Sequence, residues 1–165
     1  MKSALLRPML SSKKRVVVIG GGFLGLTTAR LLDDMDRFEV VLIDTKEYFE
    51  YVPSMIYTLV DPSCAPKWTR VYKDIIKNGT LVVNPVQSVA KDFVLAGGQK
   101  IPYHYLVLST GSSYTTQFKG HTVTTSYRSK KLALEFKSLQ AATNVLVIGG
   151  GEPPFPLSLL PFFPL

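Results

Sequence analysis

Six residues near the start of the chain have the types and spacing of a phosphate-binding turn. They fit the pattern G-x-G-x-x-G and read Gly20-Gly21-Gly22-Phe23-Leu24-Gly25. Glycine has no Cβ, so its backbone can turn sharply and approach a bound group closely. A helix that starts at such a turn offers N–H groups and the positive end of its dipole, which bind a phosphate without a Lys or Arg. The motif therefore predicts a dinucleotide site.

Each glycine of the pattern has its own expected role. Gly20 permits the tight turn, Gly22 lets the backbone approach a pyrophosphate, and Gly25 lets the following helix pack closely against the preceding strand. Asp44 stands nineteen residues after Gly25, where a carboxylate would accept hydrogen bonds from a ribose diol and repel a 2′-phosphate. This spacing favours FAD or NAD over NADP. The alternative is a glycine turn that binds nothing.

The elements that position these residues follow from the hydrophobic periodicity. Residues 15–20, R-V-V-V-I-G, and residues 39–44, E-V-V-L-I-D, are short apolar runs typical of strands buried on both faces of a parallel sheet. Between them the apolar spacing changes to that of a helix, with one face formed by Leu24, Thr28, Leu31, Leu32 and Met35. Strand, glycine turn, helix and strand together predict an α/β fold with a Rossmann-like βαβ unit.

The middle of the chain predicts a different arrangement. A short helix is expected around residues 67–77, and three short pieces, T-L-V-V-N, V-Q-S-V and F-V-L-A, predict a β-meander. Residues 105–109, Y-L-V-L-S, return to the buried-strand pattern and end at Thr110-Gly111. A further helix is expected from about Ser129, and N-V-L-V-I-G-G-G then repeats the first strand and turn. This repeat predicts the incomplete start of a second dinucleotide-binding unit.

Composition and charge limit the class of protein. With 165 residues, 46% hydrophobic and 19% charged, the chain has the composition of about one soluble globular domain. Five of its basic side chains lie in the first fifteen residues, which hold no acid, and the remainder has 14 basic and 12 acidic side chains. A basic nucleic-acid-binding face is therefore not supported. The basic, Ser-containing leader leaves a cytoplasmic or a mitochondrial location open and does not suit secretion.

We expect four regions along the chain. They are a disordered basic leader (1–14), a partial FAD-binding domain (15–128), the start of an NAD(P)-binding domain (129–151) and an irregular tail (152–165). The tail carries five of the eleven prolines, so it suits neither a helix nor a central strand. It is also too short to span a membrane, and we expect no transmembrane helix.

Six pieces in a fixed order carry a resemblance to a known family. They are V-V-V-I-G-G-G-F-L-G, V-L-I-D, Y-F-E-Y-V-P, G-T-L-V-V, Y-L-V-L-S-T-G-S and N-V-L-V-I-G-G-G, between about Arg15 and Gly151. The chain resembles the flavoprotein oxidoreductases with two dinucleotide-binding domains. Within them it is similar to the branch of type II NADH:quinone oxidoreductases and the ferroptosis suppressor, an apoptosis-inducing-factor-like protein.

The resemblance implies a set of FAD-binding residues and a reaction. In such proteins the residue matching Val82 contacts the adenine through its backbone, and the pair matching Thr110-Gly111 closes over the flavin. The implied site consists of Gly20, Gly21, Gly22, Phe23, Leu24, Gly25, Asp44, Val82, Thr110 and Gly111. Hydride would pass from NAD(P)H to FAD and electrons then to a quinone-like acceptor. Because the cofactor supplies this chemistry, we nominate no catalytic residue.

The chain also departs from the family pattern. In the second glycine motif Pro154 stands where the third glycine belongs, and prolines there remove N–H donors, which argues against NAD(P)H binding by this chain. Family members continue through a complete NAD domain and return to finish the FAD domain, so we expect a truncated member.

Two functional hypotheses remain open. One is an FAD-binding NAD(P)H:quinone-type oxidoreductase that is incomplete in this chain. The other is a non-catalytic FAD-binding fragment or interaction product that needs a partner. A single-cofactor NAD dehydrogenase is disfavoured, because the meander does not continue a simple βα alternation. Peripheral membrane association and a homo-oligomer are compatible with both hypotheses.

Other reactive residues carry weaker signals. Cys64 has no second cysteine to pair with, so a structural or incidental thiol is favoured over a redox thiol. His104 and His121 have no further ligand at metal-binding spacing, so no metal site is expected. Tyr127 and Lys131 form Y-x-x-x-K, the pattern of the catalytic pair of short-chain dehydrogenases. Those enzymes carry a different glycine pattern, so we interpret the match as a coincidence. The aromatic residues of Y-F-E-Y would flank an isoalloxazine ring or cover the sheet edge.

Overall fold

The computed structural model describes residues 12–112 and 121–146. These residues form two compact units, the first from residues 12–49 and 70–112 and the second from residues 50–69 and 121–146. The second glycine motif and the proline-rich tail lie outside the described residues. The domain boundaries expected from the sequence stay predictions.

A four-stranded parallel sheet forms the centre of the first unit. Its strands are β1 (Lys14–Ile19), β2 (Phe38–Asp44), β5 (Thr80–Val83) and β9 (Tyr105–Leu108), in the order β5-β2-β1-β9. Ile19 of β1 pairs with Ile43 on one side and with Leu108 on the other. The carboxyl ends of the strands therefore meet at one edge. The parallel, Rossmann-like sheet predicted from the βαβ pattern is confirmed.

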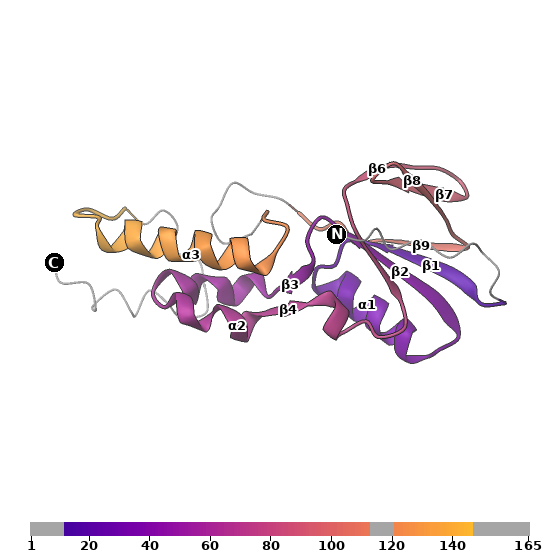
Figure 1. Ribbon diagram of the computed structural model, residues 1–165, viewed down its shortest axis with the longest axis horizontal. Coiled ribbons are helices and arrows are strands. Elements are labelled where there is room, and N and C mark those ends of the chain that lie inside the picture. Colours follow the sequence, from indigo (N-terminus) through magenta and orange to yellow (C-terminus); the bar gives the residue numbers. More distant parts are fainter. Residues whose placement is uncertain (1–11, 113–120, 147–165) are drawn as a thin grey trace. The chain divides into compact units, whose positions relative to one another are not determined.

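Different elements cover the two faces of this sheet. Helix α1 (Phe23–Asp34) lies on one face, and an antiparallel sheet of β6 (Val86–Val89), β7 (Phe93–Ala96) and β8 (Gln99–Pro102) lies on the other (Figure 1). Side chains of β1 alternate between the two cores, since Val16 and Val18 pack toward α1 while Val17 and Ile19 pack toward the antiparallel sheet. Burial on both faces explains why the strand reads as a continuous apolar run.

The meander is present, but its strands differ from those predicted. T-L-V-V-N was expected in the meander, whereas β5 pairs in parallel with β2, with Ile43 opposite Val82. The third meander strand is β8, which pairs with β7 and was not predicted. Pro85 marks a break between β5 and β6 but carries no information on which sheet each strand joins.

Most of the apolar face predicted for α1 does not pack on the sheet, although Leu32 of that face does contact the core. Leu24, Leu31 and Met35 are 69%, 55% and 56% exposed, whereas the buried positions include Gly25 and Ala29. Small side chains at those positions allow the helix to approach the sheet closely, and Leu26 fills the core beside them, while Leu24 and Leu31 lie on the flank.

The helix predicted around residues 67–77 is wrong in most of its length. The chain there forms α2 (Ala65–Trp68), β4 (Thr69–Val71) and the 3₁₀ turn η3 (Tyr72–Asp74). β4 pairs with β3 (Tyr48–Glu50), and its β-branched residues suit a strand. Next to this pair the N–H of Tyr51 donates to the carbonyl of Trp68 at 2.8 Å, and the N–H of Tyr72 donates to that of Glu47 at 3.0 Å.

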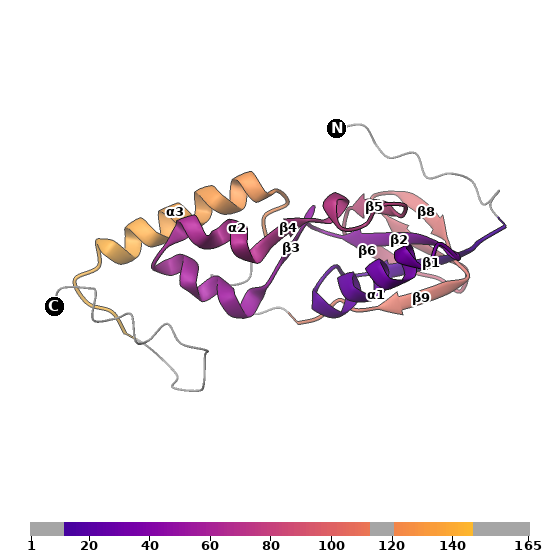
Figure 2. The same ribbon diagram turned by 90° about the horizontal axis from the view of Figure 1, so that it is seen from below.

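The second unit is helical. It contains the 3₁₀ helices η1 (Val52–Leu59) and η2 (Pro62–Cys64), the helix α2, and α3 (Thr125–Gln140), which lies beside η1 (Figure 2). α3 starts four residues before the predicted Ser129, because the hydroxyl of Thr124 accepts the N–H of Tyr127 and caps the helix.

A buried ion pair and a small apolar cluster hold this unit together. Leu132 of α3 packs in a cluster with Met55 and Ala65. Nε of Arg128 donates to Oε1 of Glu50 at 2.6 Å, and both side chains are almost completely buried.

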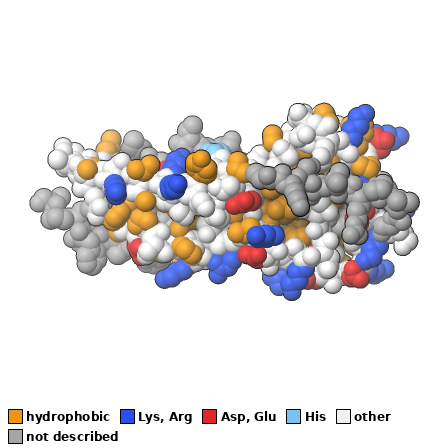
Figure 3. Space-filling model, in the orientation of Figure 1, with side chains coloured by type: hydrophobic (Ala, Val, Ile, Leu, Met, Phe, Trp, Pro, Cys, Tyr) orange, Lys and Arg blue, Asp and Glu red, His pale blue; other side chains and the backbone are white. Residues whose placement is uncertain are grey.

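Charged side chains of both signs are interspersed on the face shown in Figure 3, most clearly over the sheet-containing unit. On this face the basic residues form no continuous patch. Among the described residues, no helix combines the length and apolar character needed to cross a membrane.

Candidate dinucleotide-binding site

The glycine loop lies at the carboxyl edge of the parallel sheet, where the strand order reverses. β1 stands between β2, which follows it in the chain, and β9, which comes much later. The N–H of Gly20 donates to the carbonyl of Ile43 at 2.8 Å, so the loop starts directly above the ends of β1 and β2. Open parallel sheets bind ligands in the crevice at such a reversal.

Gly20 and Gly25 are required by space and by backbone conformation. Gly20 has φ of +96°, and a Cβ there would overlap the carbonyl of Ser109. A Cβ on Gly25 would overlap the carbonyl oxygen of Gly20 and Oγ of Ser109. These contacts agree with a tight turn at Gly20 and close packing at Gly25.

Gly22 differs from these two glycines. It is the N-cap residue of α1, with φ of −66° and ψ of −171°, and a Cβ built on it meets nothing within 4 Å. No side chain caps this end of α1, and the first turn holds no acidic residue. Phe23 and Leu24, the first residues of the helix, are about 70% exposed. The positive end of the helix therefore faces open space, as an anion requires.

Asp44 supports the loop through a hydrogen bond. Its Oδ2 accepts the N–H of Gly21 at 2.6 Å, and its Oδ1 accepts the N–H of Lys46 at 2.8 Å. Each oxygen of an ionised carboxylate has two lone pairs, so both oxygens keep acceptor capacity for a hydroxyl. The side chain is partly exposed at the sheet edge.

The other predicted residues lie at different distances from the loop. Thr110 is beside it, since a Cβ on Gly20 would lie 3.0 Å from Cα of Thr110, and Gly111 follows with φ of +69°. Val82 lies on β5, beyond β2, and its side chain is buried in the core. The N–H of Asn84 donates to the carbonyl of Asp44 at 2.9 Å. Because backbone groups alternate in direction along a strand, those of Val82 also point toward β2.

Two residues that the sequence analysis did not single out hold the loop in place. Oγ of Ser109 lies 3.0 Å from the carbonyl oxygens of both Ile19 and Gly20. The buried hydroxyl of Tyr72 donates to the carbonyl of Gly21 at 2.9 Å. Ser109 could have been found as the polar residue that ends an apolar run, although β9 is half-exposed and not the buried strand that the run predicted. Tyr72 had no such signal, because it lies in a segment predicted as helix.

The residues present fit a dinucleotide. The open backbone at Gly22 and the uncapped start of α1 suit its phosphates, and the remaining acceptor capacity of Asp44 suits a ribose diol. These three features lie on one loop and the strand end bonded to it. None of them needs a basic side chain.

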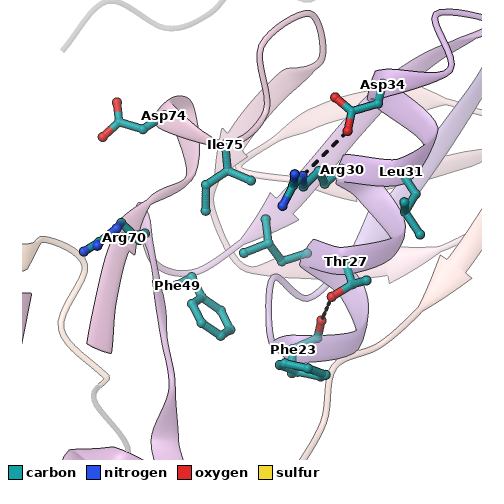
Figure 4. Close-up of a pocket in the computed structure, with 10 residues that line it drawn as sticks. Phe23, Thr27, Arg30, Leu31, Asp34, Phe49, Arg70, Asp74 and Ile75 are labelled. Atoms are coloured by element: carbon teal, nitrogen blue, oxygen red, sulfur yellow. Dashed lines mark hydrogen bonds and ion pairs between the residues drawn. The ribbon is translucent and has the colours of Figure 1, made fainter. Parts of the chain in front are cut away.

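A groove lies along the flank of α1 but does not coincide with this site. It measures about 820 Å³ and is lined by residues of α1 and by Phe49, Arg70, Asp74 and Ile75 opposite (Figure 4). Arg30 and Asp34 form an ion pair at its rim, with Nε and Oδ2 3.6 Å apart. Of the predicted site residues, only Phe23 lines this groove.

The histidines and the Y-x-x-x-K pair have ordinary surroundings. Nδ1 of His104 accepts the N–H of Arg15 at 2.9 Å. Within residues 12–112 and 121–146, no three His, Cys, Asp or Glu side chains group as a metal site. Tyr127 is 69% exposed on α3, and Nζ of Lys131 lies 3.8 Å from Oε1 of Glu135.

Cys64 and the aromatic residues of Y-F-E-Y differ in burial, from the buried Cys64 and Tyr48 to Tyr51, which is 39% exposed. The Cys64 thiol is buried, and its burial raises its pKa above the ordinary value. Tyr48 is completely buried, which favours its role as cover for the sheet. Phe49 lines the groove. Tyr51 lies against Trp68, with the ring centroids 6.4 Å apart.

Comparison with known proteins identifies the family. The family model described as pyridine nucleotide-disulphide oxidoreductase matches residues 14–152. The chain belongs to this family. Members of the pyridine nucleotide-disulphide oxidoreductase family use FAD and NAD(P)H, so the family resemblance and the cofactor class predicted from the sequence are confirmed.

Individual relatives are longer than this chain. Apoptosis-inducing factor homolog B of Dictyostelium discoideum is 30% identical over 148 residues, which cover 87% of this chain and 37% of the relative. Ferroptosis suppressor protein 1 of Xenopus tropicalis is 26% identical over 141 residues, covering 84% and 37%. The chain therefore spans little more than a third of these relatives.

A third family relative has a solved structure. The sulfide-quinone reductase of Aquifex aeolicus is 32% identical over 111 residues, which cover 59% of this chain and 24% of the relative. Its structure superposes with a TM-score of 0.61 at 23% identity and covers 79% of this chain and 33% of that one. The two chains therefore share a fold over the matched part.

Proposed function

We propose that the first unit binds FAD as part of an electron-transferring flavoprotein of the NAD(P)H:quinone oxidoreductase type. The observation that carries the proposal is the open backbone of Gly22 at the uncapped start of α1, next to the Asp44 carboxylate. Family membership supplies the cofactor class.

Each residue of the loop has a distinct part in this proposal. The backbone of Gly22, Phe23 and Leu24 holds the pyrophosphate, and Asp44 holds a ribose diol. Gly20, Gly21 and Gly25 shape the loop without a side chain of their own. Thr110 and Gly111 lie beside the loop at the switch point of the sheet, where we place the flavin end. Val82 is retained for the adenine end, although its backbone groups point toward β2.

Bound FAD would supply the redox chemistry, accepting hydride from NAD(P)H and releasing electrons to the acceptor. The chain's own residues bind and orient the cofactor, and no side chain acts as acid, base or nucleophile. A quinone-like acceptor is proposed because the Aquifex aeolicus relative is named for a quinone. Binding of NAD(P)H depends on the second glycine motif, which lies outside the described residues.

A second candidate function is a non-catalytic FAD-binding polypeptide that works with a partner. The exposed apolar side chains of the first unit favour it, above all Leu24 and Leu31 on α1 and Leu108 on β9. Exposed apolar surface of this kind marks a protein interaction site when its residues are contiguous. In this case FAD would bind, but NAD(P)H would not reduce it.

One experiment separates the proposals. The purified chain is incubated with FAD and desalted, and its visible absorbance spectrum is recorded. A retained flavin spectrum supports FAD binding, and bleaching on addition of NADH or NADPH under anaerobic conditions supports the oxidoreductase. A retained spectrum without bleaching supports the second candidate. A colourless protein that is folded by circular dichroism contradicts both.

A further inference from the structure

Tyr72 reaches the glycine loop from a distant part of the sequence. It lies in η3, between β4 and β5, and its side chain is only 1% exposed. Its hydroxyl donates to the carbonyl oxygen of Gly21 at 2.9 Å, across a sequence separation of 51 residues. Its ring belongs to the core between α1 and the sheet, together with Val18 and Leu26. The hydroxyl is therefore fixed by the packing of its own ring.

The hydrogen bond to Gly21 sets the direction of the next N–H. The peptide bond between Gly21 and Gly22 is trans. In a trans peptide the C=O and the following N–H point in opposite directions within one rigid plane. Because Tyr72 holds the C=O of Gly21 toward the core, the N–H of Gly22 is turned away from the core. This is the glycine at which a Cβ would meet nothing within 4 Å.

The opposite side of Gly21 is held as well. Its N–H donates to Oδ2 of Asp44 at 2.6 Å, so its N–H and its C=O are both bonded to side chains. A Cβ on Gly21 would overlap the hydroxyl and the ring of Tyr72. The middle glycine of G-G-G is thus explained by Tyr72, whereas the general dinucleotide pattern asks for no glycine at that position.

We infer that Tyr72 is a positioning residue for phosphate binding, because its hydroxyl orients the Gly21–Gly22 peptide so that the N–H of Gly22 faces the ligand. The inference rests on the proposed function, since it assigns Tyr72 to the same site. It predicts a defect limited to ligands that carry phosphate. A merely structural tyrosine would affect all ligands through the stability of the fold.

The test compares Tyr72→Phe with a matched control. Tyr103→Phe removes the same group from a hydroxyl that donates to the carbonyl of Ala90 at 2.7 Å in the meander, away from the loop. Wild type and both variants are titrated with ADP and with adenosine, which lacks the phosphates, and binding is followed by NMR. Thermal unfolding of each protein is recorded in parallel.

We expect Tyr72→Phe to weaken ADP binding about tenfold and to leave adenosine binding unchanged. Tyr103→Phe should change neither. Equal weakening of ADP and adenosine by Tyr72→Phe, or unchanged ADP binding, would overturn the inference. FAD binding to the wild type is measured separately, so its absence would count against the proposed function alone.

The ligand-free protein gives a second readout. In amide spectra of the ¹⁵N-labelled chain, Tyr72→Phe should shift the resonance of Gly22 and leave those of Gly79 and Gly97 in place. An unshifted Gly22 resonance would mean that the hydroxyl does not orient this peptide. This result would contradict the inference even if no nucleotide bound to the wild type.

Discussion

The carboxylate of Asp44 accepts the N–H of Gly21 at 2.6 Å, so the end of β2 is bonded to the loop that follows β1. The second oxygen of the same carboxylate accepts the N–H of Lys46. Asp44 therefore has a structural contact independent of any ligand. Its substitution should affect the fold and the cofactor in measurably different ways.

For Asp44→Ala we expect FAD binding to fall more than tenfold and the free energy of unfolding to fall by about 1.5–3 kcal/mol, the range for hydrogen bonds to a charged group. Asp44→Asn keeps one carbonyl oxygen as an acceptor. Its FAD affinity and its stability should lie between those of the wild type and those of Asp44→Ala. FAD titration and urea unfolding measure the two effects. Wild-type affinity in Asp44→Ala would remove Asp44 from the proposed site.

Gly22 and Gly25 should separate binding from folding. Gly22→Ala adds a methyl group to open space at a backbone conformation that any residue adopts, so it should cost far less stability than Gly25→Ala, while FAD binding is lost. Gly25→Ala places the methyl group on the Gly20 carbonyl and should destabilise the first unit by about 3 kcal/mol or more. Thermal unfolding measures the stability of each variant, and the absorbance assay measures its FAD binding. Full FAD retention by Gly22→Ala would mean that the phosphates bind elsewhere.

The buried pair of Glu50 and Arg128 should dominate the stability of the second unit. Arg128→Met leaves a buried carboxylate without its ion-pair partner, which costs about 3–5 kcal/mol. The double variant Glu50→Leu, Arg128→Met removes both charges and should recover most of the loss. Arg30→Ala breaks an exposed pair on α1 and serves as the control, with an expected change below about 0.5 kcal/mol. Urea unfolding measures all three, and a double variant as unstable as Arg128→Met would contradict the prediction.

Cys64 should react slowly while the chain is folded. Burial raises the pKa of its thiol, so less of the reactive thiolate is present at a given pH. Alkylation by iodoacetamide should be slower in the native chain than in urea, and its pH profile should lie at higher pH. Mass spectrometry reads the single site, since the chain has one cysteine. Equal native and unfolded rates would contradict the burial.

The same shift sets the sign of a stability change with pH. The folded pKa of Cys64 lies above the unfolded one, so the fold favours the protonated thiol. This contribution is fully present below the unfolded pKa, about 8.5, and is lost as the pH rises through the folded pKa. Cys64→Ala should lack this loss in urea unfolding at alkaline pH, and an unchanged pH dependence in that variant would assign the effect to another group.

The parallel sheet could be predicted because its central strands carry an unambiguous signal. β1 and β2 are buried on both faces, so each reads as an unbroken apolar run. β5 gave a weaker signal, since four residues next to Pro85 fit either sheet. The segment from Tyr48 to Asp74 was harder still, because its short turns and strands depend on pairing between β3 and β4 and on no local period.

The candidate site divides in the same way. The glycine spacing and Asp44 are local patterns, so the sequence alone indicated them. The contacts that hold the loop come from Ser109 and Tyr72, which lie 89 and 51 residues from the loop residues they bind. No pattern within one segment records a partner at that separation. The exposed flank of α1 was missed for a related reason, because periodicity finds an apolar face but not what covers it.

The hydrogen bond between Tyr51 and Trp68 has a consequence for how the chain tolerates changes in length. It brings together the two ends of the segment 51–68, and the bond between Glu47 and Tyr72 does the same one step closer to the sheet. A segment whose ends already meet behaves as an insertion, and a short turn could replace it without moving β3 or β4. Changes in the length of this segment, which holds Cys64 and its aromatic neighbours, should therefore leave the glycine loop as it is.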